Sequence, residues 1–267
     1  MKRRIQLRRG SIAAGLGAAL VLGAMAGVVT PACTDSPQAA GISDDTSAVL
    51  ARMSKTLMSP QFSFRSRTMR AYAGPNGELL HMVFATKTVV RRPDRMMADV
   101  TGDDGSTKML YDGKTLVAYN VDQKKYVSIP VPATIEGMLG VAEDRLGLDF
   151  PLADLLADNP ENSILAGITS GGQVGTSTID GVACRHLFFN QSADLELELW
   201  VEDNDRSLPR RVVVTYRSLP GHPTFTAELS DWDFSVHPAD ADFAFQPPAG
   251  VVQVELTAKA TTPAAPK

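Results

Sequence analysis

Two residues that could take part in chemistry stand close together at Cys184 and His186. The segment 182–190 follows the turn residues Asp180-Gly181 and is predicted to be a strand, so residues two apart share one face. A thiol and an imidazole on one face could begin a metal or reactive-thiol site, but a metal needs three or four ligands and no others are evident. The pair is therefore interpreted as a buried thiol beside a hydrogen-bonded histidine.

Two further motifs contain residue types that perform chemistry elsewhere. Asp231 and Asp233 lie two apart on another predicted strand, and paired carboxylates can serve acid–base catalysis, although solvated acids at a strand end are the favoured interpretation. Gly113-Lys114-Thr115 is similar to the end of a phosphate loop, but the first glycine of that motif would fall at Lys108, so a hairpin turn is expected. Gly-x-Ser-x-Gly, His-Glu-x-x-His and paired Cys-x-x-Cys motifs are absent from the sequence. We expect that the protein is not an enzyme and that it binds no metal and no cofactor. A hydrolase would need a nucleophile–base pair, and none can be identified in the sequence.

Basic residues form two clusters, one of Arg91, Arg92 and Arg95 and one of Arg210 and Arg211. They could meet a lipid headgroup or an acidic partner. The alternative, which we favour, is that they are the solvated ends of strands.

The N-terminus has the features of an export signal. Basic residues at 2–4 and 8–9 precede an apolar run from Ile12 to Val29, and small residues follow it. Residues 1–32 are predicted to be an export signal peptide, cleaved rather than retained as a membrane anchor. The protein is therefore expected in the periplasm, either free or tethered to a membrane.

Cys33 follows directly and allows two kinds of processing. Thr30 and Ala32 suit a general signal peptidase, whereas a lipoprotein signal would place a lipid on the Cys33 thiol. We favour lipidation of Cys33, with residues 33–44 as a tether, because the chain has only two cysteines. A lipidated Cys33 excludes a disulfide, while a free one leaves a bridge to Cys184 open.

Without residues 1–32, the chain keeps 21 basic and 30 acidic residues, a formal net charge of −9. This negative charge disfavours binding to nucleic acid. It also disfavours binding to an anionic membrane surface, so we expect membrane contact only through a lipid anchor at Cys33. The remaining length suits one large domain, placed at residues 45–256. The segment 257–267 is rich in Ala, Thr, Pro and Lys and is expected to be a disordered tail.

The pattern of the domain changes from helical to alternating and back. A helix capped by Asp44, Asp45 or Thr46 and ended by Pro60 comes first. About six strands follow, then two or three short helices after Thr134, then about five strands. This order predicts an α+β, mainly β fold with an antiparallel sheet. A sheet of about 11 strands must curl, so we expect a strongly curved, half-open β-barrel with the N-terminal helix and short lid helices on its concave face.

The apolar face of this sheet is the main candidate site, because an acyl chain needs a dry trough. The predicted sheet side of the trough consists of Phe62, Phe64, Met82, Phe84, Leu195, Leu197, Leu199, Val201, Val212, Val214 and Tyr216. The predicted lid side consists of Met138, Leu139, Leu146, Leu152 and Leu155. From these residues alone, an ordinary core between sheet and lid is the favoured alternative, since every sandwich has such stripes.

Several segments resemble a bacterial periplasmic family known as domain of unknown function 2092, in collinear order over residues 46–250. They are LARMSKTLMSPQFSFRS from Leu50, RPDR from Arg92, YDGKT from Tyr111, FPLADLL from Phe150, ACRHLFF from Ala183, LWVEDNDRSLPRRVVVTY from Leu199, LSDW from Leu229 and the segment 243–250. The resemblance implies a LolA/LolB-like half-barrel of the lipoprotein-carrier superfamily. It carries over no catalytic residues.

This resemblance implies a non-enzymatic cell-envelope protein that binds a hydrophobic ligand, a lipid or acyl chain, between sheet and lid. The alternative is an envelope scaffold or sensor whose partner is another protein.

Overall fold

The computed structural model describes residues 41–255 apart from 75, 149 and 193. These residues belong to one compact unit, residues 39–267. The predicted signal peptide, Cys33 and the tail at 257–267 lie outside the described residues, so the expectations for them stay predictions. Within residues 41–255, no helix has the length and apolar character needed to cross a membrane.

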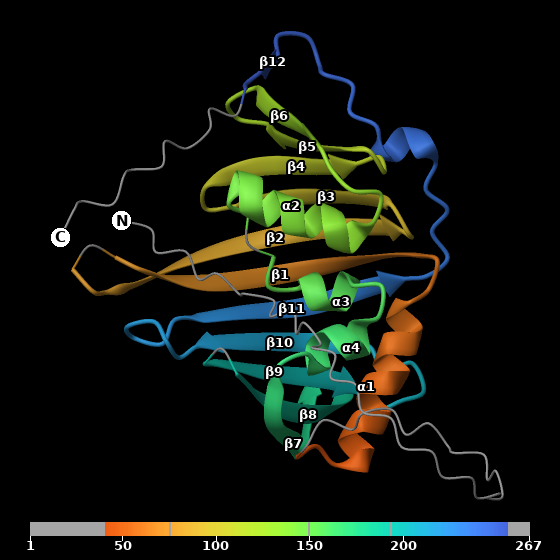
Figure 1. Ribbon diagram of the computed structural model, residues 1–267, viewed down its shortest axis with the longest axis vertical. Helices are drawn as coiled ribbons and strands as arrows, with labels where there is room; N and C mark the ends of the chain where they lie inside the picture. Colours follow the sequence, from red (N-terminus) through yellow and green to blue (C-terminus); the bar gives the residue numbers. More distant parts are fainter. Residues whose placement is uncertain (1–40, 75, 149, 193, 256–267) are drawn as a thin grey trace, which may run out of the picture. The chain divides into compact units, whose positions relative to one another are not determined.

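Twelve strands form a single sheet (Figure 1). The first six are β1 (Gln61–Ala73), β2 (Leu79–Arg91), β3 (Arg95–Gly102), β4 (Gly105–Tyr111), β5 (Thr115–Asn120) and β6 (Lys125–Pro130). The other six are β7 (Ile168–Ile179), β8 (Val182–Gln191), β9 (Leu195–Glu202), β10 (Pro209–Tyr216), β11 (Thr224–Asp233) and β12 (Val252–Gln253). Their order across the sheet is β12-β6-β5-β4-β3-β2-β1-β11-β10-β9-β8-β7.

The sheet is mixed, which corrects the expectation of a wholly antiparallel sheet of about 11 strands. The pair β12–β6 is parallel, with Val252 opposite Lys125, while the other neighbouring pairs are antiparallel. The two residues of β12 are too few to show an alternating pattern, so this strand could not be predicted from the sequence. The strands β12 and β7 form the two edges of the sheet, so the sheet is open, and the strongly curved half-barrel expected from the sequence stays a prediction.

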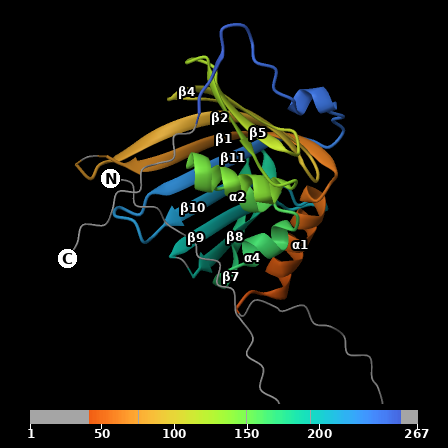
Figure 2. The same ribbon diagram turned by 45° about the horizontal axis from the view of Figure 1, so that its top comes forward.

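The path of the chain forces the short helices across the sheet. The strand β6 lies next to one edge and β7 forms the other, so residues 131–167 must span ten strand spacings, roughly 48 Å. This connection contains α2 (Ile135–Leu146), α3 (Ala153–Leu156) and α4 (Pro160–Leu165). Figures 1 and 2 show all three helices on one face of the sheet, which we call the inner face; the opposite one is the outer face.

Local signals set the ends of the helices. The first helix, α1 (Asp44–Leu57), is capped by Ser43, whose side chain accepts from the Thr46 N–H, and not by the acids or Thr46 as expected. The two acids instead occupy the first turn, where their negative charges interact favourably with the positive end of the helix dipole. Thr134 caps α2, and Gly147 ends it in the left-handed conformation at φ 66°.

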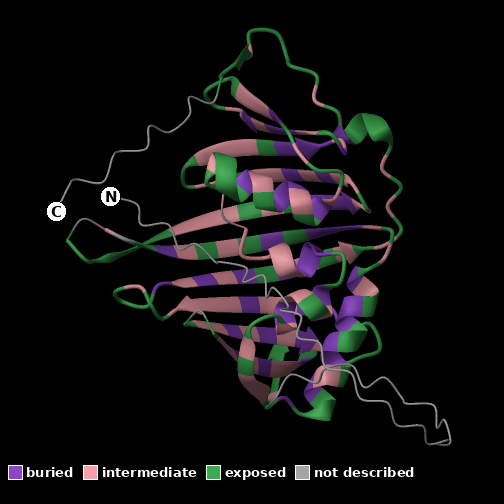
Figure 3. Cartoon of the chain, viewed as in Figure 1, coloured by how far each residue is buried: buried purple, intermediate pink, exposed green. Residues whose placement is uncertain are grey.

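The core lies between the inner face and the helices. The apolar face of α1 is fully buried, at Val49, Leu50, Met53 and Leu57. One continuous cluster joins these residues to both halves of the sheet, for example to Met96 of β3 and Phe189 of β8. Figure 3 shows buried positions along the strands of both halves. Each fully buried side chain of this size contributes about 1.5–3 kcal/mol.

Arg92, between β2 and β3, connects the sheet to two helix ends. Its Nη2 and Nε donate to the carbonyl of Leu57, the last residue of α1, at 3.1 and 3.3 Å. Its Nη1 donates to the carbonyl of Leu156, the last residue of α3, at 3.0 Å and lies 3.7 Å from Asp158 Oδ1. The side chain is 11% exposed, and this burial lowers the pKa of Arg92 while Asp158 raises it. A cation at the C-terminal carbonyls of helices is favourable, so Arg92 holds α1 and α3 in place.

Replacing Arg92 with Met should lower the free energy of unfolding by about 2–4 kcal/mol, because it leaves buried carbonyls at both helix ends without a donor. Urea unfolding of the two proteins measures this difference. The matched control is Arg217→Met, which removes a 2.8 Å ion pair to Glu196 whose arginine is 53% exposed. That change should cost less than about 1 kcal/mol, and equal losses in both variants would contradict the role given to Arg92.

Candidate functional site

The residues predicted for the sheet side of the trough all lie on the inner face. The register pairs inner-face residues with each other across the strands, as in Val212 with Leu199 and Val214 with Leu197. Six of the eleven predicted residues are buried beneath helices or neighbouring strands: Phe62, Phe64, Leu197, Leu199, Val201 and Val212. Phe64 also stacks on Trp232 with ring centroids 4.6 Å apart.

The lid side packs onto the same cluster. Met138, Leu139 and Leu155 are buried, and Leu146 and Leu152 are partly buried against the core. In this part of the protein, sheet and helices therefore contact each other as an ordinary core does. A ligand could enter here only if the helices moved.

The other five predicted residues are only partly buried: Met82, Phe84, Leu195, Val214 and Tyr216. They continue the inner face toward the β1–β2 hairpin, which extends beyond the helices (Figures 1 and 2). We call this region the open end of the inner face. It presents apolar side chains to solvent next to the buried core.

The open end also contains residues that the sequence reasoning did not select. Arg70 lies opposite Met82 on the inner face, and its guanidinium carbon is 5.4 Å from the Tyr72 ring centroid and 5.7 Å from that of Tyr216. Tyr72 and Leu80, another neighbouring pair, are 42% and 51% exposed. The alternation that begins at Phe62 predicts this face for Arg70 and Tyr72. Because Arg70 is charged, the sequence reasoning did not recognise it as part of the inner face.

The pair Cys184 and His186 does not form a reactive site. Cys184 is 1% exposed, and burial, the largest cause, raises the pKa of its thiol. His186 Nε2 lies 2.7 Å from Glu198 Oε2, and its ring stacks on Trp200 with centroids 4.0 Å apart. The interpretation as a buried thiol near a hydrogen-bonded histidine is confirmed. Among residues 41–255, no group of three or more His, Cys, Asp or Glu side chains is placed to hold a metal ion.

The other chemical motifs have local structural partners. Asp112 Oδ1 accepts from the Lys114 and Thr115 N–H groups, which makes Gly113-Lys114-Thr115 a hairpin turn as predicted. Asp231 lies at a bulge in β11 and pairs with Arg65 at 3.4 Å, while Asp233 accepts from Ser235.

The arginines of both clusters are paired with acids and at most 34% exposed, so the favoured interpretation as solvated strand ends was wrong. Contact with a lipid headgroup or an acidic partner stays a prediction. Arg91 pairs with Asp240 and Arg95 with Asp94, and Arg92 is buried as described above. In the second cluster, Arg210 lies 3.7 Å from Glu202 and Arg211 lies 2.6 Å from Glu228. Acids distant in sequence supply most of these partners, so local charge patterns could not predict them.

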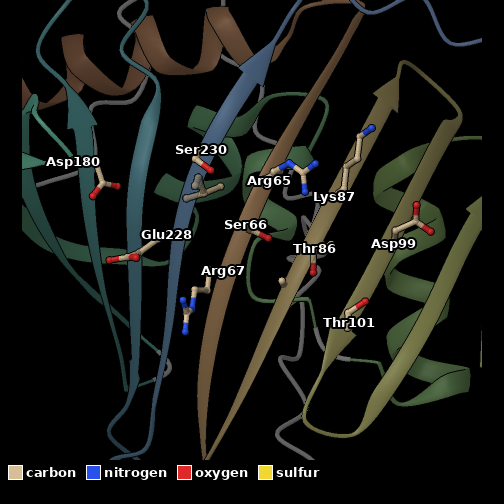
Figure 4. A pocket seen from close by; sticks show the side chains of 12 residues that line it. Arg65, Ser66, Arg67, Thr86, Lys87, Asp99, Thr101, Asp180, Glu228 and Ser230 are labelled. Atoms are coloured by element: carbon tan, nitrogen blue, oxygen red, sulfur yellow. The ribbon is translucent and has the colours of Figure 1, made fainter. Parts of the chain in front are cut away.

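Two cavities of the described residues lie on the outer face. The larger, of 490 Å³, is bounded by charged and hydroxyl-bearing side chains of β1, β2, β3 and β11 (Figure 4). The smaller, of 220 Å³, lies between β4–β6 and the C-terminal segment, with Phe243 and Phe245 in its lining. The larger is too polar to hold an acyl chain, so the open end of the inner face is the better candidate for an apolar ligand.

The thiol of Cys184 should resist modification in the folded protein. A thiol reacts only when it is accessible and ionised, and burial opposes both access and ionisation. In the chain lacking residues 1–33, where Cys184 is the only cysteine, Ellman's reagent at pH 8 should release no thiolate until guanidinium unfolds the protein. Ser218→Cys adds a thiol at an exposed position and should react at once with one equivalent. Equally fast reaction of Cys184 would contradict its burial.

Comparison with known proteins gives one strong match. A family model described as "Predicted periplasmic protein (DUF2092)" matches residues 46–257. The matched range includes the segments that carried the resemblance, and its description confirms the expected periplasmic location. No curated protein matches the chain.

Several solved structures align with this chain at low identity. An uncharacterized conserved protein from Thermus thermophilus aligns at 9% identity and a TM-score of 0.46, over 79% of this chain and 99% of the other. The lipoprotein LppX of Mycobacterium tuberculosis aligns at 15% identity and 0.46, over 73% and 99%. A LolA superfamily protein from Nitrosomonas europaea aligns at 13% identity and 0.39, over 74% and 96%. These values are too low to carry a functional argument.

Proposed function

Because the chain belongs to the DUF2092 family of predicted periplasmic proteins, we propose that it is a non-enzymatic binding protein for a hydrophobic ligand. The ligand is a lipid or acyl chain held between the inner face of the sheet and the helices α2–α4, as in a half-open barrel with a lid. Family membership places the protein in the periplasm but supplies no ligand, so the proposal rests on the geometry of the inner face.

One observation supports the proposal most directly. Among the described residues, the apolar side chains of the inner face continue from the buried Leu197 to Leu195 and Phe84, which are only partly buried. Each methylene that leaves water on such a surface contributes about 0.8 kcal/mol, so ten methylenes contribute about 8 kcal/mol before entropic costs. An acyl chain lying here would extend the core that the protein already has.

A longer ligand would need the lid to move, and the local structure favours movement of the helices rather than the sheet. α3 and α4 have 4 and 6 residues, too few to be stable without packing. The start of α2 is fixed by the Ile135 N–H, which donates to the Pro93 carbonyl at 3.0 Å. Its other end leads into Gly147, so α2 would turn about its first residues.

Arg70 would give the site a polar end. Its guanidinium lies between two tyrosine rings on an otherwise apolar face, so an anionic headgroup could bind there while the chain lies toward Phe84. Arg70 has further contacts in this structure, but a guanidinium carries five N–H donors and can bind an anion in addition.

A second candidate function, a scaffold that binds another protein, is supported by the edge strand β7, where the Gly171 N–H donates to the Gly41 carbonyl at 3.4 Å. β7 has the sequence ITSGGQVGTSTI, with no charge and no proline, and Val174 is 62% exposed. Long uncharged edge strands are usually protected, because their free backbone groups can pair with another chain. A partner strand added to β7 would use the edge rather than the inner face.

Extraction of the purified periplasmic chain (residues 34–267) with organic solvent, followed by mass spectrometry, tests the first candidate. We expect a defined lipid near one molecule per chain, and none from a control protein of the same host. Phe84→Ser should lower the bound lipid at least tenfold, whereas Val174→Asp on the edge strand β7 should leave it unchanged. An empty protein that binds no fluorescent fatty acid, together with a partner lost on Val174→Asp, would favour the scaffold.

Arg70→Gln should weaken the binding of a fluorescent fatty acid about tenfold, as expected for the loss of one charge-assisted hydrogen bond. Binding of the matching fatty alcohol should change less than about twofold, because it has no anionic head. Competition assays with the two ligands measure the difference. Equal weakening of both would assign Arg70 a packing role.

A further inference from the structure

The cavity of 490 Å³ on the outer face combines three cations from two neighbouring strands (Figure 4). Arg65 and Arg67 point outward from β1, and Lys87 points outward from β2. The register places Arg65 directly opposite Lys87. Like charges directly opposite each other on antiparallel strands destabilise the pair, so this arrangement has a cost that needs an explanation.

The acids that line the cavity include cross-strand neighbours of two of these cations, because Asp99 lies opposite Lys87 and Glu228 lies opposite Arg67. Asp99 lies 3.0 Å from Lys108, and Glu228 lies 2.6 Å from Arg211, so both carboxylates have other cations. Asp180 lines another part of the cavity, on the turn between β7 and β8. Within the described part of the chain, neither Arg67 nor Lys87 forms an ion pair or hydrogen bond, and both are exposed.

A second energetically unfavourable feature, a backbone irregularity in β11, lies beside the cations. The strand β11 has an irregular register where it passes Ser63 and Arg65, and Asp231 there adopts φ 52°. Left-handed backbone is unfavourable for a residue other than glycine, although aspartate tolerates it better than most. Bulges of this kind often redirect side chains next to binding sites. Here Asp231 reaches Arg65 at 3.4 Å, with both side chains more than half exposed, which is a weak pairing.

We propose that Arg65, Arg67 and Lys87 form a binding site for a phosphate group on the outer face. Neighbouring strands lie about 4.8 Å apart, and residues i and i+2 about 6.8 Å, so the three cations can converge on one tetrahedral anion. Two hydroxyl groups, from Ser230 and Thr101, also line the cavity and can donate hydrogen bonds. Bound phosphate would relieve the repulsion between Arg65 and Lys87. The site is independent of the ligand proposed for the inner face.

The phosphate group could belong to a free anion or to a lipid headgroup, and two measurements separate these sources. Isothermal titration of the chain 34–267 with inorganic phosphate and with glycerol 3-phosphate tests the free anion. Flotation with vesicles of phosphatidylethanolamine and phosphatidylglycerol at 3:1, with and without phosphate as competitor, tests the headgroup. Binding in the first supports a free phosphate ligand, and vesicle binding that phosphate abolishes supports a headgroup.

The variants Lys87→Gln and Arg67→Gln should each weaken phosphate binding at least tenfold. Without phosphate, Lys87→Gln should melt at the same temperature as the wild type or higher, because it removes a like-charged neighbour of Arg65. Lys55→Gln, an exposed lysine near the end of α1, is the matched control and should leave binding unchanged. The proposal is overturned if the wild type binds neither phosphate nor the vesicles, or if the control weakens binding as much as Lys87→Gln does.

Discussion

The pairing of β1 with β11 holds the two parts of the sheet together. Strands β1–β6 come from the first half of the chain and β7–β11 from the second, and they meet only where residues 63–70 pair with residues 225–233. This arrangement places β6 and β7 at opposite sides of the sheet. The residues between them must therefore cross the whole inner face, which gives the protein one core instead of two.

The crossing also explains why Arg92 is buried. A chain that passes over an apolar surface must satisfy its own backbone groups, and helical turns do so except at their ends. The last carbonyls of α1 and α3 face the sheet near the β2–β3 turn, where water is largely excluded. A guanidinium that donates to both carbonyls satisfies them and lets helices as short as α3 remain against the sheet.

Much of the fold could be predicted from the sequence, because the period of apolar residues reports which face a strand buries. The alternation from Leu195 to Val201 predicted the inner face of β9, and Thr134 predicted the start of α2. The parallel strand β12 and most partners of the arginines depend on contacts between distant segments, which no local pattern contains. The cap at Ser43 is local, but the neighbouring Asp44, Asp45 and Thr46 are equally good capping residues, so the sequence alone did not single it out. For the candidate site, the sequence predicted the apolar residues. The sequence could not show which of these apolar residues the helices would cover. Arg70 belongs to the same stripe, but its charge kept it out of the prediction.

The two faces of β1 are tied to each other by the period of the strand. Successive residues of a strand point to opposite faces, so the alternation that directs Phe62 and Phe64 inward directs Arg65 and Arg67 outward. A slip of one residue would bury the arginines and expose the phenylalanines, so the register of β1 is fixed by both faces at once. Events on the inner face therefore cannot reach the outer cavity by sliding of β1. Any coupling would have to pass through the twist of the sheet or the bulge near Asp231, where the pairing of β1 with β11 is already irregular.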